Sequence, residues 1–160
     1  MEQLKKRLEE EHVLVENHPY LKDALLISKY DYLESLETFR EGLFVVQDIS
    51  SMLVGELAHV QAGAQVIDLC AAPGGKALDV AERILMEGQA GCSGHVEARD
   101  LTEYKVSLIE ENIERMGLCN VTAVCQDASV YDEKSAGKAD IVTRPICLVP
   151  VWECLGRKQI

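Results

Sequence analysis

The sequence lacks an excess of positive charge. Its 160 residues include 16 Lys and Arg against 27 Asp and Glu, which gives a formal net charge of −11. A protein that binds nucleic-acid phosphates over a whole face needs positive charge on that face. Any contact with a nucleic acid must therefore be local or lie outside this chain.

Two further patterns are missing. The 6 cysteines form no CxxC pair and no Cys/His cluster of zinc spacing, so we expect no metal site. No run approaches the roughly 18 apolar residues of a membrane span, and the first residues, M-E-Q-L-K-K-R-L-E-E-E-H, hold no apolar signal core. We therefore expect a cytoplasmic protein with reduced thiols and no membrane contact.

The sequence does contain a regular alternation of short apolar strands with helices. With 48% hydrophobic residues and 4 prolines, it can bury a core. Strands are expected at residues 65–69, 95–98, 121–125 and 139–142, and helices at 75–86 and 102–116. This order predicts the α/β class, with right-handed connections and a doubly wound parallel sheet.

The two helices show which side chains should face the sheet. In the first, Leu78, Ala81 and Leu85 are expected to point inward. The second is the clearest helix of the chain, because Val106, Ile109, Ile113 and Met116 recur at three- and four-residue spacing and Gly117 follows as the C-cap. Lys105 and Arg115, on the same helix, are interpreted as solvated.

The residues before this alternation are less regular. Residues 1–12 are interpreted as a charged lead-in, either a solvated helix or a linker, and 13–39 as small strands and turns. Residues 41–48 predict a turn and a β-rich stretch, and Ser50 or Ser51 is expected to cap a helix that runs to about His59. We divide the chain into an N-terminal appendage (1–55), a cofactor-binding core (56–142) and an aberrant tail (143–160).

The first expected strand leads into an unusual loop, V-I-D-L-C-A-A-P-G-G-K, at Val66 to Lys76. In a doubly wound sheet such a loop lies where ligands bind. Gly74 and Gly75 let the backbone approach a ligand, and the following helix N-terminus offers free N–H groups to an anion. A phosphate would suit the same electrostatics, so a dehydrogenase or a nucleotide enzyme stays possible at this point. The glycine spacing is neither G-x-G-x-x-G nor G-x-x-x-x-G-K-[ST], which argues against both.

Two acidic residues follow later strands at the same edge. Asp100 follows V-E-A-R, where a carboxylate can accept the hydrogens of ribose hydroxyls, and Asp127 follows V-C-Q, where it could accept from an adenine amino group. An isolated Asp after a strand is at least as often a helix cap or turn former. Three features in register favour a nucleoside-containing cofactor.

The loop C-A-A-P-G-G-K resembles the cofactor loop of RNA cytosine-5 methyltransferases, the family that includes bacterial small-subunit rRNA enzymes of the Sun or Fmu type. The segments G-L-F-V-V-Q-D-I-S-S-M-L-V (42–54) and A-R-D-L-T-E-Y-K-V (98–106) are similar to the same family, so the resemblance covers roughly residues 13–142. It implies a Rossmann-like sheet, S-adenosyl-L-methionine as cofactor and RNA, in particular 16S rRNA, as partner. The cofactor-binding residues that it implies are Cys70, Ala71, Ala72, Pro73, Gly74, Gly75, Lys76, Asp100 and Asp127.

The resemblance assigns no catalytic residue to this chain. Members of the family attack cytosine C6 with a cysteine in a T-C-S segment, and a second cysteine in D-x-P-C-S-G helps to release the product. Where the second is due, residues 143–158 read T-R-P-I-C-L-V-P-V-W-E-C-L-G-R-K, which we interpret as a shift of reading frame. Cys147 and Cys154 are then incidental, and Cys70 is structural.

We therefore interpret the chain as a fragment without both cysteine motifs, with a non-catalytic cofactor-binding remnant as the alternative. An incomplete sheet should leave an exposed edge, so we expect marginal stability or self-association. A nicotinamide dehydrogenase is a third, weaker interpretation.

Overall fold

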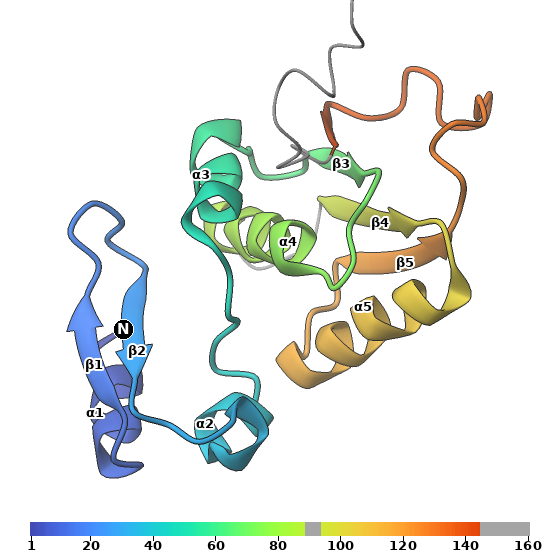
Figure 1. Ribbon diagram of the computed structural model, residues 1–160. Coiled ribbons are helices and arrows are strands. Elements are labelled where there is room, and N and C mark those ends of the chain that lie inside the picture. Colours follow the sequence, from blue (N-terminus) through green and yellow to red (C-terminus); the bar gives the residue numbers. More distant parts are fainter. Residues whose placement is uncertain (89–93, 145–160) are drawn as a thin grey trace, which may run out of the picture.

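A four-stranded parallel sheet forms the centre of the fold (Figure 1). The computed structural model describes residues 1–88 and 94–144. The strands are β3 (Gln65–Asp68), β4 (His95–Asp100), β5 (Val121–Cys125) and β6 (Ile141–Thr143), in the spatial order β5-β4-β3-β6. The expected α/β class with a parallel sheet is confirmed. The fourth strand begins two residues later than expected.

Two helices follow β3 and β4 and pack on the sheet. They are α4 (Gly75–Glu87) and α5 (Glu103–Met116). Because β3, β4 and β5 are neighbours in chain order, right-handed connections place both helices on one face. Leu78 of α4 and Ile109 of α5 are fully buried in one apolar cluster with Val66 and Val96 of the sheet. Leu85 was expected to point inward but is only half-buried. Its neighbour Ile84 is buried against the sheet instead.

The chain before the sheet forms a small unit of its own (blue in Figure 1). It consists of α1 (Glu2–Glu10), the antiparallel pair β1 (Leu14–Asn17) and β2 (Leu25–Ser28), the 3-10 helix η1 (Leu33–Ser35) and α2 (Glu37–Arg40). The expected small strands and turns at 13–39 are present. Of the two alternatives for residues 1–12, the helix is confirmed by α1. It is not a mere lead-in, because Leu8 is 1% exposed and packs with Val13, Val15 and Leu36.

The segment that joins this unit to the sheet differs from expectation. No strand forms at 41–48, and the helix α3 (Ile49–Ala58) is capped by Asp48, whose carboxylate accepts a hydrogen bond from Ser51 N, rather than by Ser50 or Ser51. Aspartate is as good an N-cap as serine, and it stands at the correct distance from the free N–H. The helix ends at His59, as expected, with a φ of 44°.

Arg115 on α5 connects the N-terminal unit to the sheet. Its Nη1 donates to the carbonyl oxygens of Phe39 at 2.9 Å and Phe44 at 3.1 Å, and its guanidinium lies 4.1 Å from the centre of the Phe39 ring. The interpretation of Arg115 as solvated is therefore wrong. The division of the chain at residue 55 stays a prediction, and that residue lies within α3.

Candidate cofactor site

The loop that carries the sequence motif lies at the carboxyl end of the parallel strands. It follows β3, and hydrogen bonds hold it to both neighbouring strands. Leu69 N donates to Thr143 O on β6, and Ala71 N donates to Arg99 O on β4, each at 2.9 Å. The side chain of Asn112 on α5 also donates to Pro73 O at 3.0 Å. The loop is thus fixed from three sides.

The loop turns sharply into helix α4. Gly74 has a φ of 118°, a conformation that side chains rarely adopt, and its N–H donates to Ala71 O at 2.7 Å. A Cβ at Gly74 would also lie 3.0 Å from Leu78 Cδ1. No side chain of the described residues caps the N-terminus of α4, so its first N–H groups remain available to an anion.

Asp100, the last residue of β4, contacts this loop directly. It is 2% exposed, and its Oδ2 accepts from Ala72 N at 3.0 Å. Its Oδ1 accepts from Leu101 N at 2.8 Å and pairs with Lys105 Nζ at 3.1 Å. Burial opposes ionisation, but these hydrogen bonds outweigh it and hold the pKa of Asp100 below its usual value. Lys105 keeps an exposed side chain beside this ion pair, which agrees with its interpretation as solvated.

Asp127 lies two residues beyond β5 and is exposed. Its Oδ1 accepts from Ser129 N at 2.8 Å and from Ser129 Oγ at 2.7 Å, and these bonds lower its pKa. The neighbouring Gln126 N donates to Asp100 O at 2.8 Å, so the two acidic loops are joined through the backbone. The geometry allows both the turn-forming role and the cofactor role that were weighed for Asp127.

Asp68 is a site residue that the sequence reasoning missed. It ends β3, is 0% exposed, and accepts from Cys70 N at 3.4 Å. Burial raises the pKa of its carboxyl, although Lys76 Nζ at 3.9 Å from Oδ2 counters the effect. An acidic residue inside the apolar strand V-I-D-L was the signal that could have revealed it.

Gln47 is a second residue that was not singled out. A Cβ on Gly75 would lie 3.5 Å from Gln47 Cγ, so the segment before α3 borders the loop. Gln47 Nε2 and Asp68 Oδ2 are both buried with no hydrogen-bond partner among the described residues. Buried polar atoms without partners beside a loop are candidates for contact with a polar ligand.

Cys70 and Cys125 show no sign of activation as nucleophiles. Cys70 is half-buried, and burial together with Asp100 raises the pKa of its thiol. Cys125 is exposed and its pKa is raised as well. A raised pKa leaves less thiolate, which is the nucleophilic form. The expectations for Cys147, Cys154 and the altered tail from residue 145 onward concern residues that lie outside those that the structure describes.

Two further observations limit the kinds of site present. Within residues 1–88 and 94–144, no three His, Cys, Asp or Glu side chains gather closely enough to hold a metal ion. Among the same residues, no helix has both the length and the apolar character needed to cross a membrane.

Comparison with known proteins places the loop and the sheet in one family. The family model described as 16S rRNA methyltransferase RsmB/F matches residues 56–148. The ribosomal RNA small subunit methyltransferases B of Yersinia pseudotuberculosis and Yersinia pestis are each 36% identical over 109 residues. That match covers 68% of this chain and 24% of the relative, so the chain spans about a quarter of the length of these relatives.

Solved structures show the same fold. PH0851 superposes with a TM-score of 0.80 at 27% identity, over 90% of this chain and 31% of the other. A methyltransferase homologue from Pyrococcus horikoshii gives 0.67 at 26% identity, over 79% and 40%. NSun6 from the same organism, determined with SFG, gives 0.55 at 30% identity, over 66% and 27%.

Proposed function

Because this chain belongs to the 16S rRNA methyltransferase RsmB/F family, we propose that it forms the S-adenosylmethionine-binding part of an enzyme that methylates C5 of a cytosine in small-subunit rRNA. The observation that carries the proposal is the contact of Asp100 with the loop after β3. The proposal places the chain in the cytoplasm, with its RNA partner.

The residues present fit this cofactor. The uncapped N-terminus of α4 suits its carboxylate, and Gly74 leaves room for a close approach to the backbone. The buried Asp68 Oδ2 and Gln47 Nε2 have no hydrogen-bond partner among the described residues and can take up further polar groups. The ionised Asp100 is an acceptor for the ribose hydroxyls, and the half-exposed Lys105 side chain can give way to them.

The chemistry divides between cofactor and chain. Bound S-adenosylmethionine supplies the methyl group. The loop Cys70 to Lys76 holds the amino-acid part of the cofactor, Asp100 the ribose, and Asp127 the adenine. The strands β3 and β4 fix the loop and Asp100 relative to each other through the Ala71–Arg99 and Ala72–Asp100 hydrogen bonds. These fixed contacts support the proposal, because rigid elements would hold the bound cofactor in one position.

Binding of S-adenosylhomocysteine, measured by calorimetry, tests the cofactor site. We expect Asp100→Asn to weaken binding about tenfold or more, because hydrogen bonds to a charged group contribute about 1.5–3 kcal/mol. Asp140→Asn is the matched control: its Oδ2 also accepts a backbone N–H, from Gln65 at 2.8 Å, but at the opposite end of β3. No binding by the unaltered chain, equal losses in both variants, or preferential binding of NAD would overturn the assignment.

A second candidate function is that of a non-catalytic S-adenosylmethionine-binding remnant. It is favoured by the sequence T-R-P-I-C-L at 143–148, where the family resemblance calls for D-x-P-C-S-G. Incubation of this polypeptide with labelled cofactor and unmodified small-subunit rRNA separates the two. Labelled RNA would establish methyl transfer; cofactor binding without labelled RNA would support the remnant.

A further inference from the structure

Arg99 is an unusual residue for the middle of a parallel sheet. It lies on β4 directly before Asp100 and is 4% exposed. Successive residues of a strand point to opposite faces, so Arg99 and Asp100 serve different sides of the sheet. Burying a guanidinium costs several kcal/mol unless it is paired, and an apolar residue would stabilise the sheet equally well.

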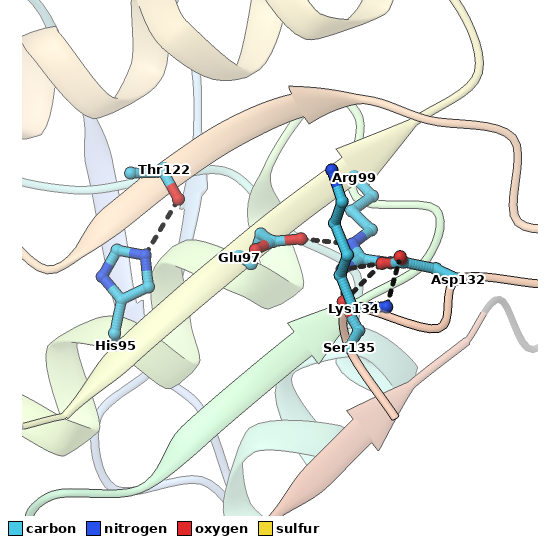
Figure 2. A network of polar contacts seen from close by, with 7 residues as sticks. All are labelled: His95, Glu97, Arg99, Thr122, Asp132, Lys134 and Ser135. Atoms are coloured by element: carbon cyan, nitrogen blue, oxygen red, sulfur yellow. Dashed lines mark hydrogen bonds and ion pairs between the residues drawn. The ribbon is translucent and has the colours of Figure 1, made fainter. Parts of the chain in front are cut away.

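The partners of Arg99 lie mainly on the segment that joins β5 to β6 (Figure 2). Its Nη2 lies 3.2 Å from Asp132 Oδ2 and donates to Ser135 Oγ, and its Nε donates to Glu97 on the same strand. Figure 2 shows these side chains converging, while His95 and Thr122 form a separate pair farther along the strands. Arg99 thus ties the segment 126–140 to the sheet.

Asp132 gathers this segment around the guanidinium. It accepts from Ser135 Oγ at 2.5 Å and from Lys134 N at 3.0 Å. Hydrogen bonds from Ser135 and Gln126, together with the charge of Arg99, lower the pKa of Asp132 to about 2. It is therefore ionised at neutral pH and pairs with Arg99 as a full charge.

The held segment begins with the residue proposed to contact adenine. Asp127 follows Gln126, whose backbone N–H is bonded to Asp100 O and whose side chain bonds to Asp132. The Asp127 carboxylate is exposed and its own bonds go to Ser129 within the same turn. Its position relative to the sheet therefore depends on the contacts on either side of it.

We propose that Arg99 is a positioning residue for adenine recognition: by holding Asp132 and Ser135 on the face of β4 opposite Asp100, it fixes the turn that presents the Asp127 carboxylate to the 6-amino group of the cofactor. This inference rests on the proposed cofactor site. It assigns the two faces of β4 separate tasks, Asp100 toward the ribose and Arg99 toward the adenine loop.

Comparison of S-adenosylhomocysteine with S-inosylhomocysteine isolates the amino-group contact. The hypoxanthine base of S-inosylhomocysteine carries an oxygen in place of the 6-amino group, so it has no donor at that position for Asp127. We expect the unaltered chain to prefer the adenine ligand about tenfold, the value of one charge-assisted hydrogen bond. Arg99→Met and Asp132→Asn should each reduce this preference below about threefold and leave the affinity for the inosine ligand unchanged within about twofold. Calorimetry measures the affinity of each variant for both ligands.

Two additional variants sharpen the test. Arg99→Lys keeps a charge but not the fork of donors, so it should restore part of the preference. His95→Gln is the matched control, because His95 Nε2 pairs with Thr122 Oγ1 at 2.8 Å on the neighbouring strand and should leave the preference intact. Asp132→Asn alters only the loop side of the contact, so it decides the question where Arg99→Met fails to fold.

The outcomes are distinguishable. Retention of the full preference in Arg99→Met or Asp132→Asn overturns the role of Arg99 and leaves the proposed function standing. An equal loss of affinity for both ligands shows a general structural role and also overturns it. If the unaltered chain binds both ligands equally, adenine is not read by Asp127; if it binds neither, the proposed function fails as well.

Discussion

Two aspartates end neighbouring parallel strands, and both are buried, yet their pKa values move in opposite directions. Burial raises the pKa of Asp68, and the opposing effects are too weak to cancel it: Lys76 Nζ lies 3.9 Å from the carboxylate, and the hydrogen bond from Cys70 N is long. Three good donors lower the pKa of Asp100. The surroundings of Asp100, the carboxylate proposed to hold the ribose, therefore favour its ionised form, while the surroundings of Asp68 favour the neutral form.

This difference predicts opposite pH dependences of stability. A carboxyl with a raised folded pKa stabilises the fold most when protonated, and the stabilisation declines as pH rises above the ordinary value of 3.8 toward the raised one. Asp68→Asn removes this decline, so its unfolding free energy should rise relative to the unaltered chain as the pH increases from about 4 to about 7. Urea titrations at several pH values measure the difference.

Asp100→Asn is the control of opposite sign. The lowered pKa of Asp100 provides stabilisation above 3.8 that is lost as the pH falls toward the folded value, so this variant should become relatively less stable as the pH rises. Parallel pH profiles for the unaltered chain and both variants would contradict the assignment of opposite shifts.

Some of the residues that sequence reasoning placed wrongly have partners far away in the chain. Arg115 was interpreted as solvated because its helical neighbours are charged, but its partners Phe39 and Phe44 lie 76 and 71 residues earlier. Asp68 was treated as part of an apolar strand, and only the fold reveals that Lys76 and Thr143 surround it. Local patterns contain no information on such contacts.

Among the elements, those with strong local patterns were predicted best. The strand at 121–125 and the helix ending at Gly117 agree with the structure, because apolar periodicity and a glycine C-cap are local signals. The turn and β-rich stretch expected at 41–48 form no strand, because the backbone there is engaged differently: Phe44 O accepts from the Arg115 side chain. β propensity alone does not supply a pairing partner.

The contact of the N-terminal unit with α5 predicts unequal effects of two glycine substitutions. Gly42 and Gly117 have similar φ values of 73° and 65°, so alanine at either costs about 1 kcal/mol of backbone strain. A Cβ on Gly117 meets nothing within 4 Å, whereas one on Gly42 would lie 1.9 Å from Arg115 O. Gly42→Ala should therefore destabilise by about 1–3 kcal/mol more than Gly117→Ala.

Urea unfolding of the two variants checks this contact. Gly117→Ala controls for strain, since it differs from Gly42→Ala only in the absence of a close neighbour. Equal destabilisation of the two would show that the N-terminal unit does not pack against α5 at Gly42.

At the scale of the whole molecule, two apolar clusters are built separately. Leu8, Val13, Val15 and Leu36 form one in the N-terminal unit, and the sheet with α4 and α5 forms the other. The sequence indicated the larger cluster through its strand and helix periodicity. The smaller one depends on pairing between short, weakly patterned segments, which is why α1 was interpreted as solvated.

Among the residues that the structure describes, the sheet also has a strand edge without a partner strand. Among the described strands, β6 pairs only with β3, and its Val142 is 56% exposed. An unprotected strand edge with an apolar side chain favours pairing with a second copy. We therefore predict concentration-dependent dimerisation of this polypeptide in sedimentation velocity, weakened about tenfold or more by Val142→Lys, since a lysine on an edge strand opposes pairing.

Val130→Lys is the matched control: Val130 is 63% exposed but belongs to no strand, so its replacement should leave the dimer unchanged. A monomer at all concentrations, or equal weakening by both lysines, would contradict association through β6 and leave nonspecific apolar contact as the cause.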